Sequence, residues 1–152
     1  MRSFELNIFI DRPQSEVYDH ISEPINMIGL LPLLTTIDVL KEQKDANGVI
    51  LRPFYTVETF RWAGIPLYRN RTYSVLHLTK PKQQLELRVY GRPGIRVVYR
   101  YDFRQDEEKR THLIQRVDFE RVSKLLENLV FNRAIHTQRA LLTNLKVRLE
   151  KR

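Results

Sequence analysis

Residues 123–150 read SKLLENLVFNRAIHTQRALLTNLKVRLE and contain neither proline nor glycine. The stretch predicts one continuous helix that begins at Ser123, a residue type suited to cap a helix N-terminus, and extends roughly 40 Å. Polar residues recur at three- and four-residue steps along one side: Asn128, Asn132, His136, Arg139, Thr143, Lys146 and Glu150. The opposite side carries Leu126, Val130, Ala134, Thr137, Leu141 and Leu145. The helix is therefore amphipathic and should cover an apolar surface.

That apolar surface is predicted by residues 35–121, in which strand-like runs alternate with turns. Turn signals at 45–48, 63–66, 80–82, 92–94 and 105–110 delimit about six strands. The connections are too short for helical crossovers, so the strands should pair antiparallel. In the clearest strands one face is apolar and aromatic, with Leu85, Leu87 and Val89, then Val97, Tyr99, Tyr101 and Phe103, then Leu113, Val117 and Phe119. The other face is charged, so the dry face needs a cover.

The N-terminal residues add one strand and two short helices. Alternating apolar residues from Phe4 to Ile10 predict a half-buried strand, and Pro13 and Glu16 favour a short helix over about 14–21. The apolar stretch 25–34, interrupted by Pro32, predicts a second small helix that seals one end of the core. The sequence thus predicts an α+β fold, with a curved antiparallel sheet of about seven strands and a long C-terminal helix packed across it. No repeat or linker divides the chain, so we expect one domain over residues 1–152.

Several segments resemble motifs of the START-like, or SRPBCC, superfamily, which has the helix-grip fold and includes polyketide cyclase/dehydrase-like and Bet v 1-like proteins. Residues 13–21, PQSEVYDHI, resemble its first-helix pattern, and residues 23–27 with Leu31-Pro32 resemble its next segment. Gly48, Lys80-Pro81 and residues 110–113 match further positions in order along nearly the whole chain. Members often carry tryptophan just before the Leu-Pro step, where this chain has Leu30.

The resemblance implies a ligand-binding domain that holds a hydrophobic molecule between sheet and helix. Members include polyketide cyclases and dehydrases, lipid and sterol carriers, coenzyme Q-binding proteins and plant hormone receptors. Because one fold serves such different functions, the site residues must decide which one applies.

Composition excludes several classes of chemistry. The chain has no cysteine, so disulfides, thiolate metal sites and cysteine nucleophiles are absent. Its first residues alternate instead of forming the apolar run of a signal peptide, and no stretch is long and apolar enough to span a bilayer. We therefore expect a cytoplasmic protein. The net charge of +8 permits attraction to nucleic acid or anionic lipid, although the basic residues are scattered and form no polybasic run.

No catalytic constellation is recognisable in the sequence. The histidines His20, His77, His112 and His136 lack a metal-ligand spacing, and we interpret them as structural or solvated, with His77 the least settled. No serine lies in a G-x-S-x-G elbow, and the five glycines form no phosphate-binding loop. We expect no metal and no cofactor, and the catalytic residues, if any, stay unknown.

The aromatic residues are the best candidates for a ligand site. An apolar cavity with a few hydroxyl donors suits tyrosine, which is rigid and polar at one tip. The predicted ligand-binding residues are Tyr55, Trp62, Tyr73, Tyr99, Tyr101, Phe119, Val130 and Phe131, with ordinary core packing as the alternative for any single one. Tyr99 and Tyr101 are favoured together because adjacent inward tyrosines leave two hydroxyls to satisfy in a dry interior.

For two predicted strands the sequence does not decide which face points inward. Residues 49–60 and 65–78 carry Glu58, Arg69, Arg71 and His77, and a one-residue bulge there would turn any of them inward. Arginines 69, 71, 88, 96, 100 and 104 alternate along neighbouring strands and form a basic sheet face. On that face Tyr90 is the only clear aromatic, so we interpret the face as solvated, with at most weak contact to anionic membrane or nucleic acid.

Three functional hypotheses follow. The first is a binder or carrier of a hydrophobic small molecule such as a lipid, polyketide or isoprenoid. The second is a cyclase- or dehydratase-type enzyme that uses the same cavity. The third is a membrane-surface or nucleic-acid adaptor that uses the basic face. Neither the ligand nor the oligomeric state follows from the sequence.

Overall fold

The computed structural model describes residues 2–92 and 94–152, without the side chains of residues 60–62, 67 and 68. Its elements follow one another as β1 (Ser3–Ile10), α1 (Gln14–Ile21), η1 (Pro24–Met27), β2 (Leu34–Val39), β3 (Gln43–Lys44), β4 (Ile50–Trp62), β5 (Ile65–Lys80), β6 (Gln84–Gly91), β7 (Ile95–Gln105), β8 (Thr111–Arg121) and α2 (Glu127–Glu150). This order confirms the α+β class and the predicted arrangement of strand, short helices, meander and terminal helix.

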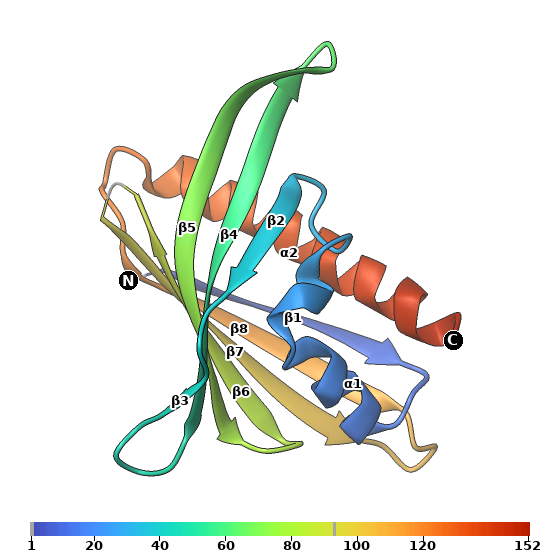
Figure 1. Cartoon of the computed structure of the whole chain (residues 1–152). Helices are drawn as coiled ribbons and strands as arrows, with labels where there is room; N and C mark the ends of the chain where they lie inside the picture. The colour runs from blue at the N-terminus through green and yellow to red at the C-terminus, as the bar shows by residue number, and fades with distance from the viewer. Residues whose placement is uncertain (1, 93) are drawn as a thin grey trace.

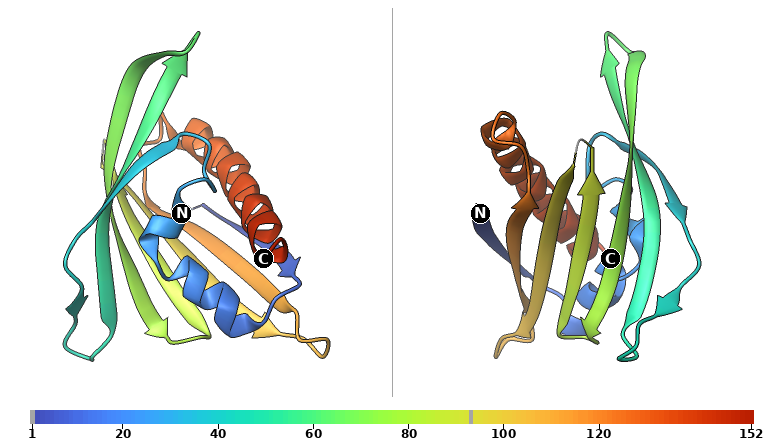
Figure 2. Two further views of the ribbon diagram at one scale, coloured as in Figure 1. Left: turned by 45° about the vertical axis from the view of Figure 1, so that its right-hand side comes forward. Right: turned by 90° about the vertical axis from the view of Figure 1, so that its left-hand side faces the viewer.

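The strands form one antiparallel sheet in the order β1-β8-β7-β6-β5-β4-β2, with β3 paired to β4. Each strand from β4 to β8 pairs with the next along the chain, as short connections require, and β1 closes the row beside β8. The sheet curves around α2, which crosses its concave face (Figures 1 and 2). Strands β4 and β5 are the longest, and their hairpin rises beyond the rest of the sheet (Figure 1).

The short helices agree in part with the sequence prediction. Helix α1 spans Gln14–Ile21 as expected, and Pro13 precedes it with a φ of −61° that suits a helix start. The second helix is a single 3-10 turn, η1, over Pro24–Met27, instead of a helix over 25–34. Gly29 has a φ of +89°, a backbone conformation that ends any helix in this stretch.

Helix α2 begins at Glu127, so the predicted start at Ser123 is wrong. Ser123 instead closes a separate turn, in which its carbonyl oxygen accepts the backbone N–H of Leu126 at 3.1 Å. The predicted faces are correct in the C-terminal half, where Leu141 and Leu145 are buried while His136 and Arg139 are exposed.

The core has two parts. The larger cluster joins α1, both sheet edges and the C-terminal half of α2, and includes Val17, Phe54, Leu76, Leu113 and Leu145. The smaller one lies under the N-terminal half of α2 and is built on Val97, Val117 and Phe119.

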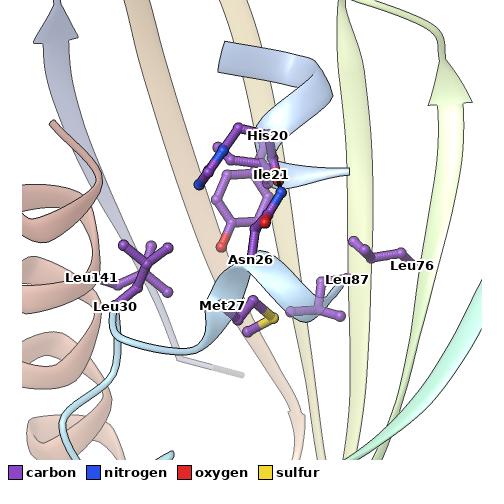
Figure 3. A pocket seen from close by; sticks show the side chains of 9 residues that line it. His20, Ile21, Asn26, Met27, Leu30, Leu76, Leu87 and Leu141 are labelled. Atoms are coloured by element: carbon purple, nitrogen blue, oxygen red, sulfur yellow. Dashed lines mark hydrogen bonds between the residues drawn. The ribbon is translucent and has the colours of Figure 1, made fainter. Parts of the chain in front are cut away.

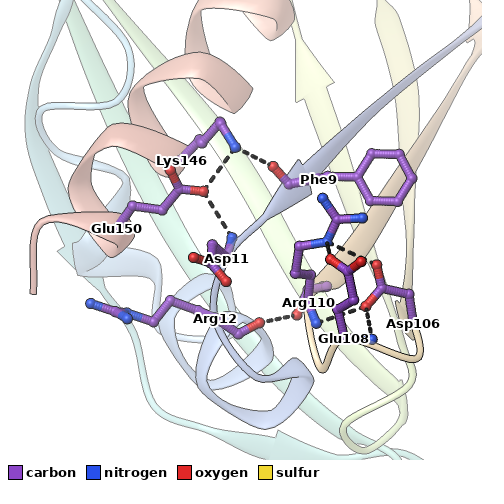
Figure 4. A network of polar contacts seen from close by, with 9 residues as sticks. Phe9, Asp11, Arg12, Asp106, Glu108, Arg110, Lys146 and Glu150 are labelled. Carbon is purple, nitrogen blue, oxygen red and sulfur yellow. Dashed lines mark hydrogen bonds and ion pairs between the residues drawn. The ribbon is translucent and has the colours of Figure 1, made fainter.

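Polar contacts fix the C-terminal end of α2 against the first strand (Figure 4). The Lys146 ammonium donates to the Phe9 carbonyl oxygen at 2.6 Å and to Glu150 at 2.8 Å, and Glu150 accepts the backbone N–H of Asp11. Within the described residues, no helix is both long enough and apolar enough to cross a membrane.

Candidate functional site

An apolar pocket lies inside the fold where α1 and η1 meet the sheet and α2. Its lining comes from six elements and the segment after η1, and consists of His20, Ile21, Asn26, Met27, Leu30, Leu76, Leu87, Tyr101 and Leu141 (Figure 3). The cavity volume is about 20 Å³, close to what a single water molecule needs. A larger molecule would therefore have to displace part of the lining.

His20 is the pocket's one titratable imidazole, and it is almost fully buried. Burial, and then the charges of Arg152 and Arg148, lower the pKa of His20 to about 4, so the ring is neutral at physiological pH. Its Nε2 lies 3.3 Å from an Arg148 guanidinium nitrogen. A neutral ring nitrogen can accept a hydrogen bond from that guanidinium.

Arg148 holds the wall of the pocket in place. Its guanidinium donates to the carbonyl oxygens of Asn26 at 2.5 Å and Ile28 at 2.6 Å, joining α2 to η1 and to the segment that follows it. A Cβ at Gly29 would lie 2.6 Å from a terminal nitrogen of the same guanidinium, so a larger residue would force Arg148 to shift and would also be strained by the positive φ. The wall is thus attached to α2 by polar contacts that a conformational change could break and remake.

A buried polar network borders the pocket through Tyr101. The Gln115 side-chain amide donates to the Tyr101 hydroxyl and to the side-chain oxygen Oε1 of Gln138, both at 2.8 Å. Gln115 is 0% exposed. The side-chain oxygen of Gln115 has no partner among the described residues. A buried acceptor without a donor is costly, so this atom is a natural partner for a donor on a bound molecule.

Glu58 also faces the interior, beyond the apolar end of β4. Phe54, Thr56 and Glu58 share one face of β4 by alternation, and Phe54 is 0% exposed in the core. Burial raises the pKa of Glu58, while the charge of Arg133 on α2 opposes that rise. Burial, and then the charge of Glu58, raise the pKa of Tyr99. The charge of Glu58 is thus felt by Tyr99 on β7, and the charge of Arg133, an exposed residue of α2, is felt by Glu58.

The inward face of the β4–β5 hairpin is polar around Glu58. Thr56 pairs with Thr72 and Glu58 with Asn70, and Ser74 lies opposite Phe54. The sequence left the inward face of these two strands open and named Glu58 as one residue that could turn inward, but it did not identify the threonines and Asn70 beside it. The alternation of Thr56 and Glu58 with Tyr55 and Val57 is the signal that could have revealed this polar row.

Tyr99 and Tyr101 lie inside the fold as predicted. Tyr101 is 4% exposed, and Tyr99 packs against both core clusters. Phe119, Val130 and Phe131 lie in the smaller cluster, where Phe131 contacts Phe4 and Phe119 at ring-centroid distances of 5.5 and 5.4 Å. They pack the core and do not line the pocket described above.

The placement of Tyr55 and Tyr73 differs from the prediction. Their inward neighbours Phe54 and Ser74 are buried, so both tyrosines point to the outer face of the sheet and do not line the interior. The side chain of Trp62 lies outside the described residues. In the described part of the chain, no three histidine, aspartate or glutamate side chains gather as a metal site would require.

The family model described as polyketide cyclase / dehydrase and lipid transport matches residues 1–150. The chain belongs to this family. No curated protein matches the chain. The fold is shared with solved structures that cover nearly the whole length of both chains. One is the Zhui aromatase/cyclase from Streptomyces sp. R1128, with a TM-score of 0.69, 16% identity and coverage of 97% of this chain and 95% of that chain. Another is a START superfamily protein from Mycobacterium smegmatis, with a TM-score of 0.72, 13% identity and coverage of 98% of this chain and 97% of that chain. A protein of Thermus thermophilus is similar, with a TM-score of 0.71, 15% identity and coverage of 97% and 96%.

Proposed function

We propose that the chain binds a hydrophobic small molecule between the sheet and α2 and holds it without chemical change. The observation that carries this proposal is an apolar pocket whose wall residue Tyr101 is hydrogen-bonded to Gln115, a fully buried side chain with an unpartnered oxygen. Apolar walls would bind the body of such a ligand, and the few polar atoms would set its orientation. The ligand should therefore be mainly apolar and carry at least one hydroxyl or amide donor.

Ligand entry would require the pocket to widen. The present volume is about that of one water molecule, and the segment after η1 is attached to α2 through hydrogen bonds from Arg148 to Ile28 and from Asn144 to Leu30. Outward movement of that segment would join the pocket to the polar interior near Tyr99 and Glu58. Family membership supports this interpretation, since its description includes lipid transport.

Organic extraction of the purified protein followed by mass spectrometry tests the proposal. We expect one defined, mainly apolar compound in near-stoichiometric amount. Rebinding of that compound to the stripped protein should weaken in Tyr99→Phe by about 2- to 10-fold, the effect of one lost hydrogen bond. Tyr90→Phe, a matched change on the outer face, should leave the affinity unchanged. Recovery of no compound, together with failure of the apolar dye anilinonaphthalene sulfonate to bind, would exclude an interior ligand site.

A second function is favoured by Glu58 alone. A carboxyl group whose pKa is raised by burial suits general acid–base catalysis of a cyclisation or dehydration, and Glu58 faces the interior beside Tyr99. If the chain is such an enzyme, Glu58→Gln should lower the rate of conversion of the extracted compound by about 10²- to 10⁴-fold with little change in its affinity. Product analysis by mass spectrometry measures this. If the wild-type protein does not convert the compound, the enzymatic function is excluded and the carrier function is the one that stands.

The same variant has an expected effect on stability. Because the folded state raises the pKa of Glu58, the protonated form favours folding, and stability contributed by that proton is lost as the pH rises through the folded-state value. Glu58→Gln should therefore be more stable than the wild type at pH 7 and lose that advantage at pH values below the ordinary carboxyl pKa. This outcome would show that the carboxylate is kept in the interior at a cost, as functional groups often are.

A further inference from the structure

Three tyrosines form a row across the outer face of the sheet, on the side away from α2. Tyr55 of β4 pairs directly with Tyr73 of β5, which pairs directly with Tyr90 of β6. Their ring centroids are 5.2 and 5.9 Å apart, and all three side chains are partly exposed. The next position in the row is Arg96 of β7, which pairs with Tyr90. We name these four residues the tyrosine row.

A guanidinium group lies against the ring at each end of the three tyrosines. The Arg71 guanidinium lies 3.9 Å from the Tyr55 ring centroid, and that of Arg96 lies 5.2 Å from the Tyr90 centroid. Both arginines are exposed, so their other faces and edges are open to a ligand. Arg71 is also 3.8 Å from the exposed Asp38 carboxylate, a weak pair at that exposure.

The surrounding face is basic. The outward positions of β5, β6 and β7 carry more arginines than carboxylates, with Arg69, Arg71, Arg88, Arg96, Arg100 and Arg104 against Glu86 and Asp102. Glu86 is already paired with Arg88 at 2.8 Å and with Arg100 at 3.4 Å. At the β2 end of the row, Asp38 pairs with Tyr55 and places one carboxylate there. The arginines of β5, β6 and β7 still outnumber the carboxylates on this face, and their net positive charge is complementary to a phosphate backbone.

We propose that the tyrosine row binds single-stranded nucleic acid. The bases would stack on the tyrosine rings and on the Arg71 and Arg96 guanidinium planes, while neighbouring arginines contact phosphates. From the sequence, Tyr90 was the only clear aromatic residue on the basic face, which argued against nucleic-acid binding. Tyr55 and Tyr73 also face outward beside Tyr90, so that argument no longer applies. A membrane surface fits less well, because the row is made of tyrosine and arginine and presents no exposed aliphatic side chain to enter hydrocarbon.

Fluorescence anisotropy with a labelled oligouridylate of about twelve nucleotides tests the proposal; this length is within the range that aromatic sheet surfaces accommodate. We expect binding at about 50 mM salt that falls steeply by about 200 mM, and weaker binding of a duplex, whose bases cannot stack on side chains. Tyr73→Leu should weaken binding about 5- to 100-fold, whereas Tyr73→Phe, which keeps the ring, should retain it. Arg96→Ala, which removes a guanidinium plane, should also weaken binding. Arg69→Ala, which removes an exposed neighbouring arginine assigned to phosphate, should reduce the slope of log K against log salt by about one.

Controls separate the tyrosine row from general charge and from misfolding. Arg139→Ala removes one exposed arginine from α2, on the other side of the molecule, and should change the affinity far less than Arg96→Ala. Circular dichroism and urea unfolding check that Tyr73→Leu is folded. The proposal is wrong if the wild type does not bind the oligonucleotide at low salt, or if Tyr73→Leu and Tyr73→Phe bind equally. It is also wrong if only vesicles with anionic lipid are bound.

Discussion

Replacing Leu141 by alanine should lower the free energy of unfolding by about 2–5 kcal/mol. Leu141 is 3% exposed on α2 and lines the pocket next to Leu30 and Tyr101. The change removes buried methyl groups and leaves a cavity that the rigid sheet on the opposite side cannot close fully. Urea unfolding followed by circular dichroism measures the loss.

His136→Ala on the same helix is the matched control. His136 is exposed, and a surface substitution of this kind changes stability by no more than about 0.5 kcal/mol. Similar losses from Leu141→Ala and His136→Ala would mean that α2 does not cover the sheet with the face assigned here. Because Leu141 also lines the pocket, folded Leu141→Ala protein should bind a bulky apolar dye at least as well as the wild type does.

The faces of α2 could be predicted because they follow from one periodicity. Leu141 and Leu145 recur on one side and His136 and Arg139 on the other, and a helix longer than six turns must bury the apolar side. The start of α2 could not be predicted in the same way. Ser123 satisfies the rule for a cap, but its oxygen serves a separate turn that ends at Leu126, and two local solutions of similar free energy compete at this point.

The strand faces could be predicted only where one side is charged. In β6 and β7 the alternation of leucine or tyrosine with arginine leaves one possible orientation. In β4, Phe54 and Tyr55 are both aromatic, so the alternation is compatible with either orientation. The decisive fact is the pairing of Tyr73 with Tyr90, which already faced outward, and this long-range register is not written in either strand alone.

The polar part of the candidate site was hidden for a related reason. Burying Glu58 costs desolvation free energy, so hydrophobicity favours its exposure, and the sequence could only leave the inward face of this strand open. Its inward position follows from Phe54, which is four residues earlier on the same face and is fixed in the core. Gln115 was likewise missed because it replaces an apolar residue between Leu113 and Val117 on the inward face of β8. Places where the sequence pattern fails in this way are expected at functional sites.

Gln115 is therefore the position where stability and ligand binding can be separated. Gln115→Leu should lower the free energy of unfolding by about 1–3 kcal/mol for each of the two groups that it leaves without a partner, the Tyr101 hydroxyl and the Gln138 carbonyl oxygen. Urea unfolding measures this loss, and Gln115 itself is 0% exposed in the folded state.

The triple variant Gln115→Leu, Gln138→Leu, Tyr101→Phe removes every polar member of the network while keeping similar volumes. Replacing all partners of a buried hydrogen bond by apolar groups of similar shape is nearly neutral, so the triple variant should regain most of the stability lost in Gln115→Leu. If the unpartnered oxygen of Gln115 accepts a hydrogen bond from the ligand, affinity for the extracted compound should stay about 2- to 10-fold below that of the wild type. Isothermal titration calorimetry measures that affinity. Full affinity in the triple variant would assign the network to core packing alone, because a ligand oriented by Gln115 must lose that bond when the amide is gone.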